Sequence, residues 1–124
     1  MSVMKRIAEL IPVGSRLNTP SGSSEFEITE LSSKRIIVTV GERNTRIAIP
    51  GSCFENSVAF LKGKDWVRIG AIHSFSYPGS FDAYIKDFTK GVSAASYVSP
   101  ILEKAGIVQI NPIRPAKIKL KLSD

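Results

Sequence analysis

The sequence predicts an α+β fold, in which a small antiparallel β lobe is followed by a lobe of helices and a closing strand. Three observations indicate this. Residues 25–49 contain short runs that alternate apolar and polar residues and are rich in β-branched side chains, as half-buried strands are. Residues 52–61, 81–90 and 93–105 space their apolar residues at helical intervals. The last segment, AKIKLKL, alternates with a period of two, which is typical of a strand.

Length and composition indicate one domain. The chain has 124 residues, of which 43% are hydrophobic, enough to bury a core. We predict a single compact domain over residues 1–124, with a β-rich sub-lobe at residues 1–70 and a second sub-lobe at residues 71–124. No apolar run approaches the ~18 residues that a membrane span needs, and charges interrupt the N-terminal segment where a signal peptide would be apolar. We therefore expect a cytoplasmic protein without a membrane partner.

The first half of the chain is predicted to contain a helix, several strands and a second helix. Val3–Ile11 has helical apolar spacing, and Pro12 ends it. The runs EFEIT, RIIVTV and TRIAI predict two to four antiparallel strands, and GERN is typical of a hairpin connection. Ser52 is expected to cap the second helix, with Glu55 completing a capping box three residues later.

The second half is predicted to contain a strand, two helices at helix-turn-helix spacing, and a final pair of strands. DWVRIGAIHSF alternates as a strand does. Ser80 is expected to cap a helix that Gly91 closes, and Ser93 to cap a second helix that Gly106 ends in the left-handed conformation. Only a few residues, KGVS, separate the two helices. This spacing is typical of a helix-turn-helix, which presents its second helix to the DNA major groove.

A proline interrupts the second of these helices. Pro100 has no N–H to donate to the carbonyl of Ser96. The helix is therefore expected either to bend there or to begin afresh, with Ser99 as its cap and Pro100 as its first residue.

Positive charge gathers near the C-terminus. The chain has 17 Lys and Arg against 11 Asp and Glu, a net charge of +6, which favours a polyanionic partner. Arg114 is followed by three lysines at alternate positions of the predicted last strand, about 6.6 to 7 Å apart, which is close to the spacing of phosphates along one nucleic-acid strand. The alternative is an edge strand whose lysines prevent it from pairing with another chain.

The segment VSPILEKAGIVQI, with the basic loop and strand after it, resembles the recognition helix and wing of winged helix-turn-helix transcription regulators. In that family the recognition helix commonly leads through L..AG[LI]V into the wing, and the resemblance covers roughly the last 45 residues. It implies a DNA-binding surface on the exposed face of the helix and on the wing. Because the helix has one basic residue, near its C-terminal end, phosphate contacts are expected to dominate over base reading. The predicted nucleic-acid-binding residues are Ser93, Ser96, Tyr97, Ser99, Lys104, Asn111, Arg114, Lys117, Lys119 and Lys121.

The function predicted from these features is non-catalytic binding of duplex DNA, as a regulator or as an accessory subunit of a DNA-handling system. Winged-helix regulators are often dimers, so the resemblance allows a homodimer. Two alternatives stay open. One is a protein-interaction or assembly subunit whose lysines only keep it in solution. The other is a binder of single-stranded RNA that uses the aromatic loop from Phe75 to Tyr77.

The sequence predicts no catalytic residues, metal site or cofactor. One cysteine, Cys53, and one histidine, His73, cannot supply the roughly four ligands of a zinc site. A nucleophile and base pair of Cys53 and His73 would require the two to meet, and a lone cysteine beside Phe54 is more typical of a small buried hydrophobe. The chain also lacks a glycine-rich loop that ends in Gly-Lys-Ser/Thr, so nucleotide-dependent chemistry is not expected.

Overall fold

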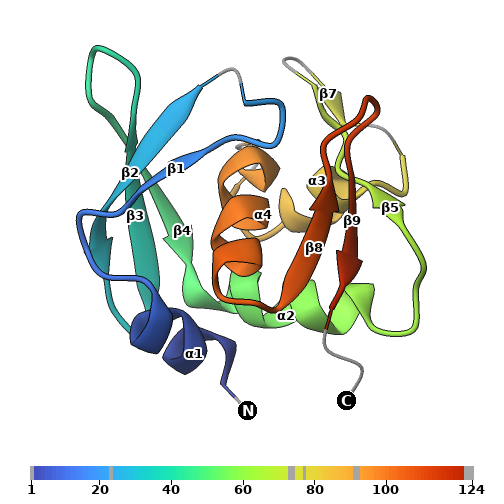
Figure 1. Ribbon diagram of the computed structural model, residues 1–124, viewed down its shortest axis with the longest axis horizontal. Coiled ribbons are helices and arrows are strands. Elements are labelled where there is room, and N and C mark those ends of the chain that lie inside the picture. The colour runs from blue at the N-terminus through green and yellow to red at the C-terminus, as the bar shows by residue number, and fades with distance from the viewer. Residues whose placement is uncertain (1, 23, 73–74, 77, 91–92, 122–124) are drawn as a thin grey trace.

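The computed structural model describes residues 2–22, 24–72, 75–76, 78–90 and 93–121. Within them, helices and antiparallel sheets form an α+β fold, which confirms the predicted class (Figure 1). The helices are α1 (Val3–Leu10), α2 (Gly51–Leu61), α3 (Phe81–Ile85) and α4 (Ala95–Lys104).

A four-stranded meander forms the larger sheet, on the left of Figure 1. Its strands follow the chain in order: β1 (Arg16–Asn18), β2 (Glu25–Leu31), β3 (Arg35–Val40) and β4 (Thr45–Pro50). The predicted hairpin connection between β3 and β4 is confirmed, and the N–H of Asn44 donates to the carbonyl of Gly41 within it. Phe26 and Ile28 of β2 face the core, while Glu25 lies on the exposed side.

A smaller sheet pairs strands from distant parts of the chain. Its order is β5-β9-β8, and the separate hairpin β6-β7 lies nearby in the sequence. These strands are β5 (Val67–Arg68), β6 (Ala71–Ile72), β7 (Phe75–Ser76), β8 (Val108–Asn111) and β9 (Lys117–Leu120). The long strand predicted over DWVRIGAIHSF is therefore wrong. The chain breaks it at Gly70, whose φ of 71° no regular strand adopts.

Helix α4 lies at the centre of the molecule, between the two sheets (Figure 1). The ring of Tyr97 meets the ring of Phe26 edge to face, with centroids 5.2 Å apart. One hydrophobic core contains residues from both predicted sub-lobes. Strand β5, which precedes residue 70, pairs with β9 of the second sub-lobe. Residue 70 therefore does not separate the sheets. The buried residues of α4 are Ala95, Val98, Ser99, Pro100, Ile101 and Leu102.

Helix α4 ends as predicted. Gly106 has φ of 75°, the N–H of Ile107 donates to the carbonyl of Leu102 at 3.0 Å, and the N–H of Gly106 donates to the carbonyl of Glu103 at 2.9 Å. These two bonds define a Schellman motif. The predicted new start at Pro100 is wrong, because α4 begins at Ala95 and runs through the proline.

Of the two serines predicted to cap α3 and α4, one does so and the other does not. Ser93 does not cap α4, because its hydroxyl donates to the buried carboxylate of Asp82 at 3.0 Å. Asp82 also accepts from the N–H of Ala95 at 3.4 Å, so a residue of α3 occupies the N-terminus of α4. Ser80 does cap α3, which ends at Ile85 and is shorter than predicted. Gly91, the predicted end of that helix, lies outside the described residues.

Glu55 is the other cap that differs from its prediction. Helix α2 begins at Gly51, and Glu55 does not complete a capping box at Ser52. Its carboxylate instead accepts from the N–H groups of Val3 and Met4, at 3.2 and 3.0 Å. The reason is that α1 packs against α2, and the free amides at the start of α1 lie within reach of the carboxylate.

Glu55→Ala is expected to lower the free energy of unfolding by about 1–2 kcal/mol, because it removes the charged acceptor at the start of α1. Urea denaturation followed by circular dichroism measures this change. Glu9→Ala is the matched control, since Glu9 is exposed at the other end of the same helix. Equal losses from the two substitutions would contradict a capping role for Glu55.

Candidate functional site

The outer face of the sheet β5-β9-β8 carries the lysines of the C-terminal strand that the sequence singles out. Ile118 of β9 is fully buried and pairs with Val67 and Ile110, so the residues on either side of it point outward. Lys117 lies between Arg68 and Asn111, and Lys119 lies beside Gln109. We define the basic sheet face as Trp66, Arg68, Gln109, Asn111, Lys117, Lys119 and Lys121.

Cations lie next to one another on this face. Arg68 is directly opposite Lys117, a pairing that destabilises an antiparallel sheet. Among the described residues, Lys117 and Lys121 have no ion pair, while Lys119 contacts Asp65 at 3.3 Å. That pair is largely exposed and contributes little to stability. The pKa of Asp65 is lowered first by the N–H of Trp66 and then by Lys119.

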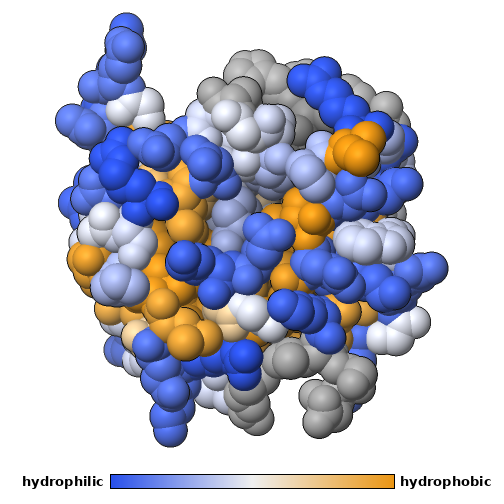
Figure 2. All heavy atoms as spheres, viewed as in Figure 1, coloured by the Kyte–Doolittle hydropathy of each residue, from blue (hydrophilic) through white to orange (hydrophobic). Residues whose placement is uncertain are grey.

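The charge of the whole chain shows the same asymmetry. Residues 62–121 contain ten of the 17 Lys and Arg but four of the 11 Asp and Glu. On the four-stranded sheet, by contrast, two arginines have acidic partners: Arg16 contacts Glu25 at 2.8 Å and Glu27 at 3.1 Å, and Arg35 contacts Glu30 at 2.9 Å. The net positive charge of the chain therefore lies in the part that builds the smaller sheet, whose side of Figure 2 is mainly hydrophilic.

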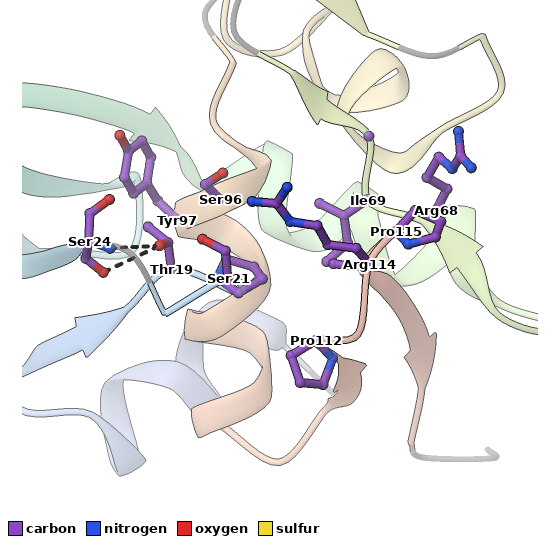
Figure 3. Close-up of a pocket in the computed structure, with 13 residues that line it drawn as sticks. Thr19, Ser21, Ser24, Arg68, Ile69, Ser96, Tyr97, Pro112, Arg114 and Pro115 are labelled. Atoms are coloured by element: carbon purple, nitrogen blue, oxygen red, sulfur yellow. Dashed lines mark hydrogen bonds between the residues drawn. The ribbon is translucent and has the colours of Figure 1, made fainter.

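A pocket of about 650 Å³ opens between the β1–β2 loop and the β8–β9 loop (Figure 3). We name it the interlobe pocket. Arg114 extends from the β8–β9 loop across it, toward Ser21 and Ser96, and Tyr97 lies on the far side. It is lined by Thr19, Pro20, Ser21, Ser24, Arg68, Ile69, Gly70, Ser96, Tyr97, Pro112, Arg114, Pro115 and Ala116. No Asp or Glu is among these described residues, so the lining favours an anion.

A second hollow continues from this pocket along α4. It has a volume of about 670 Å³ and shares the segment Thr19–Ser21 and Pro112 with the interlobe pocket. At its other end it reaches Glu103 and Lys104. The edge strands β1 and β8 thus border one groove, which runs along α4.

The predicted binding residues fall into three groups. Lys117, Lys119, Lys121 and Asn111 belong to the basic sheet face; the Asn111 side chain also accepts from the N–H of Ile113 at 3.1 Å. Four of the predicted residues line the groove. Ser96, Tyr97 and Arg114 line the interlobe pocket, and Lys104 lines the second hollow. Ser93 and Ser99 lie apart from both surfaces.

The expectation that Ser99 lies on an exposed face of α4 is wrong. Ser99 is fully buried, and its hydroxyl has no hydrogen-bond partner among the described residues. Helix α4 is packed between the two sheets, so little of it is left open. Beyond Ser96 and Tyr97 at one end and Glu103 and Lys104 at the other, the helix is buried. Helix α4 therefore presents its two ends, and not a long face, to a partner.

Sequence reasoning missed Arg68, Gln109 and the serines of the β1–β2 loop. Arg68 alternates with Val67 in the sequence, and this alternation is a signal for an outward side chain. What the sequence does not show is that β5 pairs with β9, which brings Arg68 beside Lys117.

Cys53 is poorly suited to nucleophilic chemistry. It is fully buried, and burial raises the pKa of its thiol to about 12. At neutral pH the thiol keeps its proton, and the thiolate is the reactive form. His73, its predicted partner, and Tyr77 of the aromatic loop lie outside the described residues. Within the described ranges, no three His, Cys, Asp or Glu residues gather as metal ligands would, and no helix is long and apolar enough to cross a bilayer.

Comparisons with known proteins give no relative: no family model, no curated protein and no solved structure matches the chain.

Proposed function

We propose that this protein binds double-stranded DNA, without catalysis, through phosphate contacts on the basic sheet face. The observation that carries the proposal is the row of cations on this face, where Arg68 lies directly opposite Lys117 and where Lys117 and Lys121 have no ion pair among the described residues. Each phosphate that a lysine neutralises releases condensed counterions, and this release is the source of affinity. A role as a regulator or accessory subunit of a DNA-handling system fits such binding.

The arrangement of elements supports a winged-helix-like lobe. Helix α2, strand β5, helices α3 and α4 and the hairpin β8–β9 follow one another, and β9 lies between β5 and β8. The hairpin then takes the position of the wing. Because α4 is covered by the four-stranded sheet, the proposed DNA contacts come from the hairpin and β5 and not from a reading helix.

Replacing Lys117, Lys119 and Lys121 together with alanine is expected to weaken duplex binding and to reduce the slope of log K against log salt by about 2–3, since each phosphate contact contributes ~0.9. Fluorescence anisotropy with a labelled mixed-sequence duplex at several salt concentrations measures both. The matched control removes the same charge from the other side of the molecule, at Lys34, Arg43 and Arg46, which are exposed. An unchanged slope, or an equal change in the control, would contradict the assignment of the phosphate contacts to the basic sheet face.

A second candidate function is assembly with another protein. Leu10 and Val13, at the end of α1 and just after it, are 50% and 59% exposed, and exposed apolar side chains favour a protein contact. This candidate predicts self-association, a homodimer included, that depends on concentration, with no binding to duplex at low salt. Light scattering over a concentration series, beside the anisotropy experiment, distinguishes the two.

A further inference from the structure

The interlobe pocket lies where a strand bound on the basic sheet face would arrive. Lys119 and Lys117 lead along β9 toward the β8–β9 loop, and Arg114 of that loop extends into the pocket. The volume of about 650 Å³ is within the range of small-molecule sites, ~300–1,000 Å³. A paired duplex is far wider than such a pocket, whereas one nucleotide is of a suitable size.

The polar part of the lining suits a phosphate. The guanidinium of Arg114, an exposed residue, has no hydrogen bond or ion pair with any described residue. Its planar fork matches the geometry of a phosphate. The side chains of Ser21 and Ser96 lie opposite it and add hydroxyl groups (Figure 3). The N-terminus of α4 is not needed for the anion, since the Asp82 carboxylate already occupies it.

The remaining lining suits the flat apolar faces of a base. Pro112 and Pro115 come from the β8–β9 loop, and Ile69 from the residue after β5. Tyr97 lies across from them, and its ring is held by the edge-to-face contact with Phe26 at 5.2 Å. Bases stack on aromatic rings largely irrespective of sequence. The pocket therefore combines one cation, hydroxyls and an aromatic wall, the groups that a single nucleotide needs.

We infer that the interlobe pocket binds one unpaired nucleotide of the nucleic acid that lies on the basic sheet face, with its phosphate on Arg114 and its base beside Tyr97. This inference rests on the proposed function and deepens it. It makes the protein a reader of a local defect in a duplex, such as a bulged or extruded nucleotide, because only an unpaired nucleotide can leave the stack at little cost.

Two duplexes of the same sequence test this inference, one fully paired and one with a single unpaired 2-aminopurine nucleotide. The wild-type protein is expected to bind the second about tenfold more tightly and to change the 2-aminopurine fluorescence. Ser96→Phe, which fills the pocket, and Arg114→Ala should bind the two duplexes with equal affinity, whatever either substitution does to the affinity for the paired duplex. Arg46→Ala, which removes one exposed charge far from the pocket, should keep the preference.

The outcomes separate the two proposals. Equal affinity of the wild type for both duplexes would overturn the nucleotide pocket and leave the proposed function in place. No binding of either duplex at low salt would overturn both. Arg114→Ala keeps the test decisive if Ser96→Phe does not fold, because Arg114 is exposed in a loop. A preference that survives Arg114→Ala would also overturn the assignment of the phosphate to that residue.

Discussion

Phe26→Ala is expected to lower the free energy of unfolding by about 3–5 kcal/mol, the cost of removing a large buried aromatic side chain and leaving a cavity. Phe26 is 1% exposed and lies between the four-stranded sheet and α4, against Tyr97. A loss of this size corresponds to a fall in Tm of roughly 10–20 °C for a chain of this length. Thermal and urea denaturation followed by circular dichroism measure it.

Two controls accompany this substitution. Phe26→Leu keeps most of the buried volume and should cost roughly 1–1.5 kcal/mol. Trp66→Ala removes a large aromatic side chain that is 40% exposed, and should cost much less than Phe26→Ala. If Phe26→Ala cost no more than Trp66→Ala, α4 would not be packed against the larger sheet, and the central position of this helix would be wrong.

Asp82→Ala is expected to cost about 3 kcal/mol, because several groups depend on this one buried carboxylate. The Asp82 carboxylate is fully buried, accepts from Ser93 and from the N–H of Ala95, and lies 3.7 Å from the ammonium of Lys86. Removing it leaves these donors without their charged acceptor at the start of α4. Urea denaturation measures the loss.

Asp87→Ala is the matched control for Asp82, since Asp87 is exposed in the turn after α3. It should change the free energy of unfolding by less than about 0.5 kcal/mol. Asp82→Asn keeps the shape and part of the hydrogen bonding, so its cost should lie between the two. Similar costs for Asp82→Ala and Asp87→Ala would show that the buried carboxylate does not hold α3 and α4 together.

The features that the sequence predicted well are those that depend on neighbours in the chain. The β-branched run RIIVTV, the period of two in KIKLKL, the cap at Ser80 and the left-handed end of α4 at Gly106 each follow from local geometry. Glu55 and Ser93 could not be predicted in the same way. Each is a good local cap by sequence. In the structure, however, Glu55 accepts from the first amides of α1, and Ser93 donates to Asp82 of α3.

The residues of the candidate site show the same difference between features set by neighbours in the chain and features set by distant elements. The lysines of β9 were predicted, because their alternation with aliphatic residues is local. Ser99 was expected on an exposed face, and its burial depends on how α4 packs between elements that are distant in the sequence. Arg68 was missed because it joins Lys117 through a strand pairing that spans about fifty residues. Tertiary pairing decides these positions, and no periodicity within a segment reveals it.

The central position of α4 has a consequence for how the chain folds. Phe26 and Tyr97 are about seventy positions apart in the sequence, and their contact closes a long loop. The entropy of that closure must be lost before the buried face of α4 gains its packing partners. Helix α4 is therefore expected to gain stability late, after both sheets have begun to form, and the chain to fold more slowly than a helical bundle of similar size.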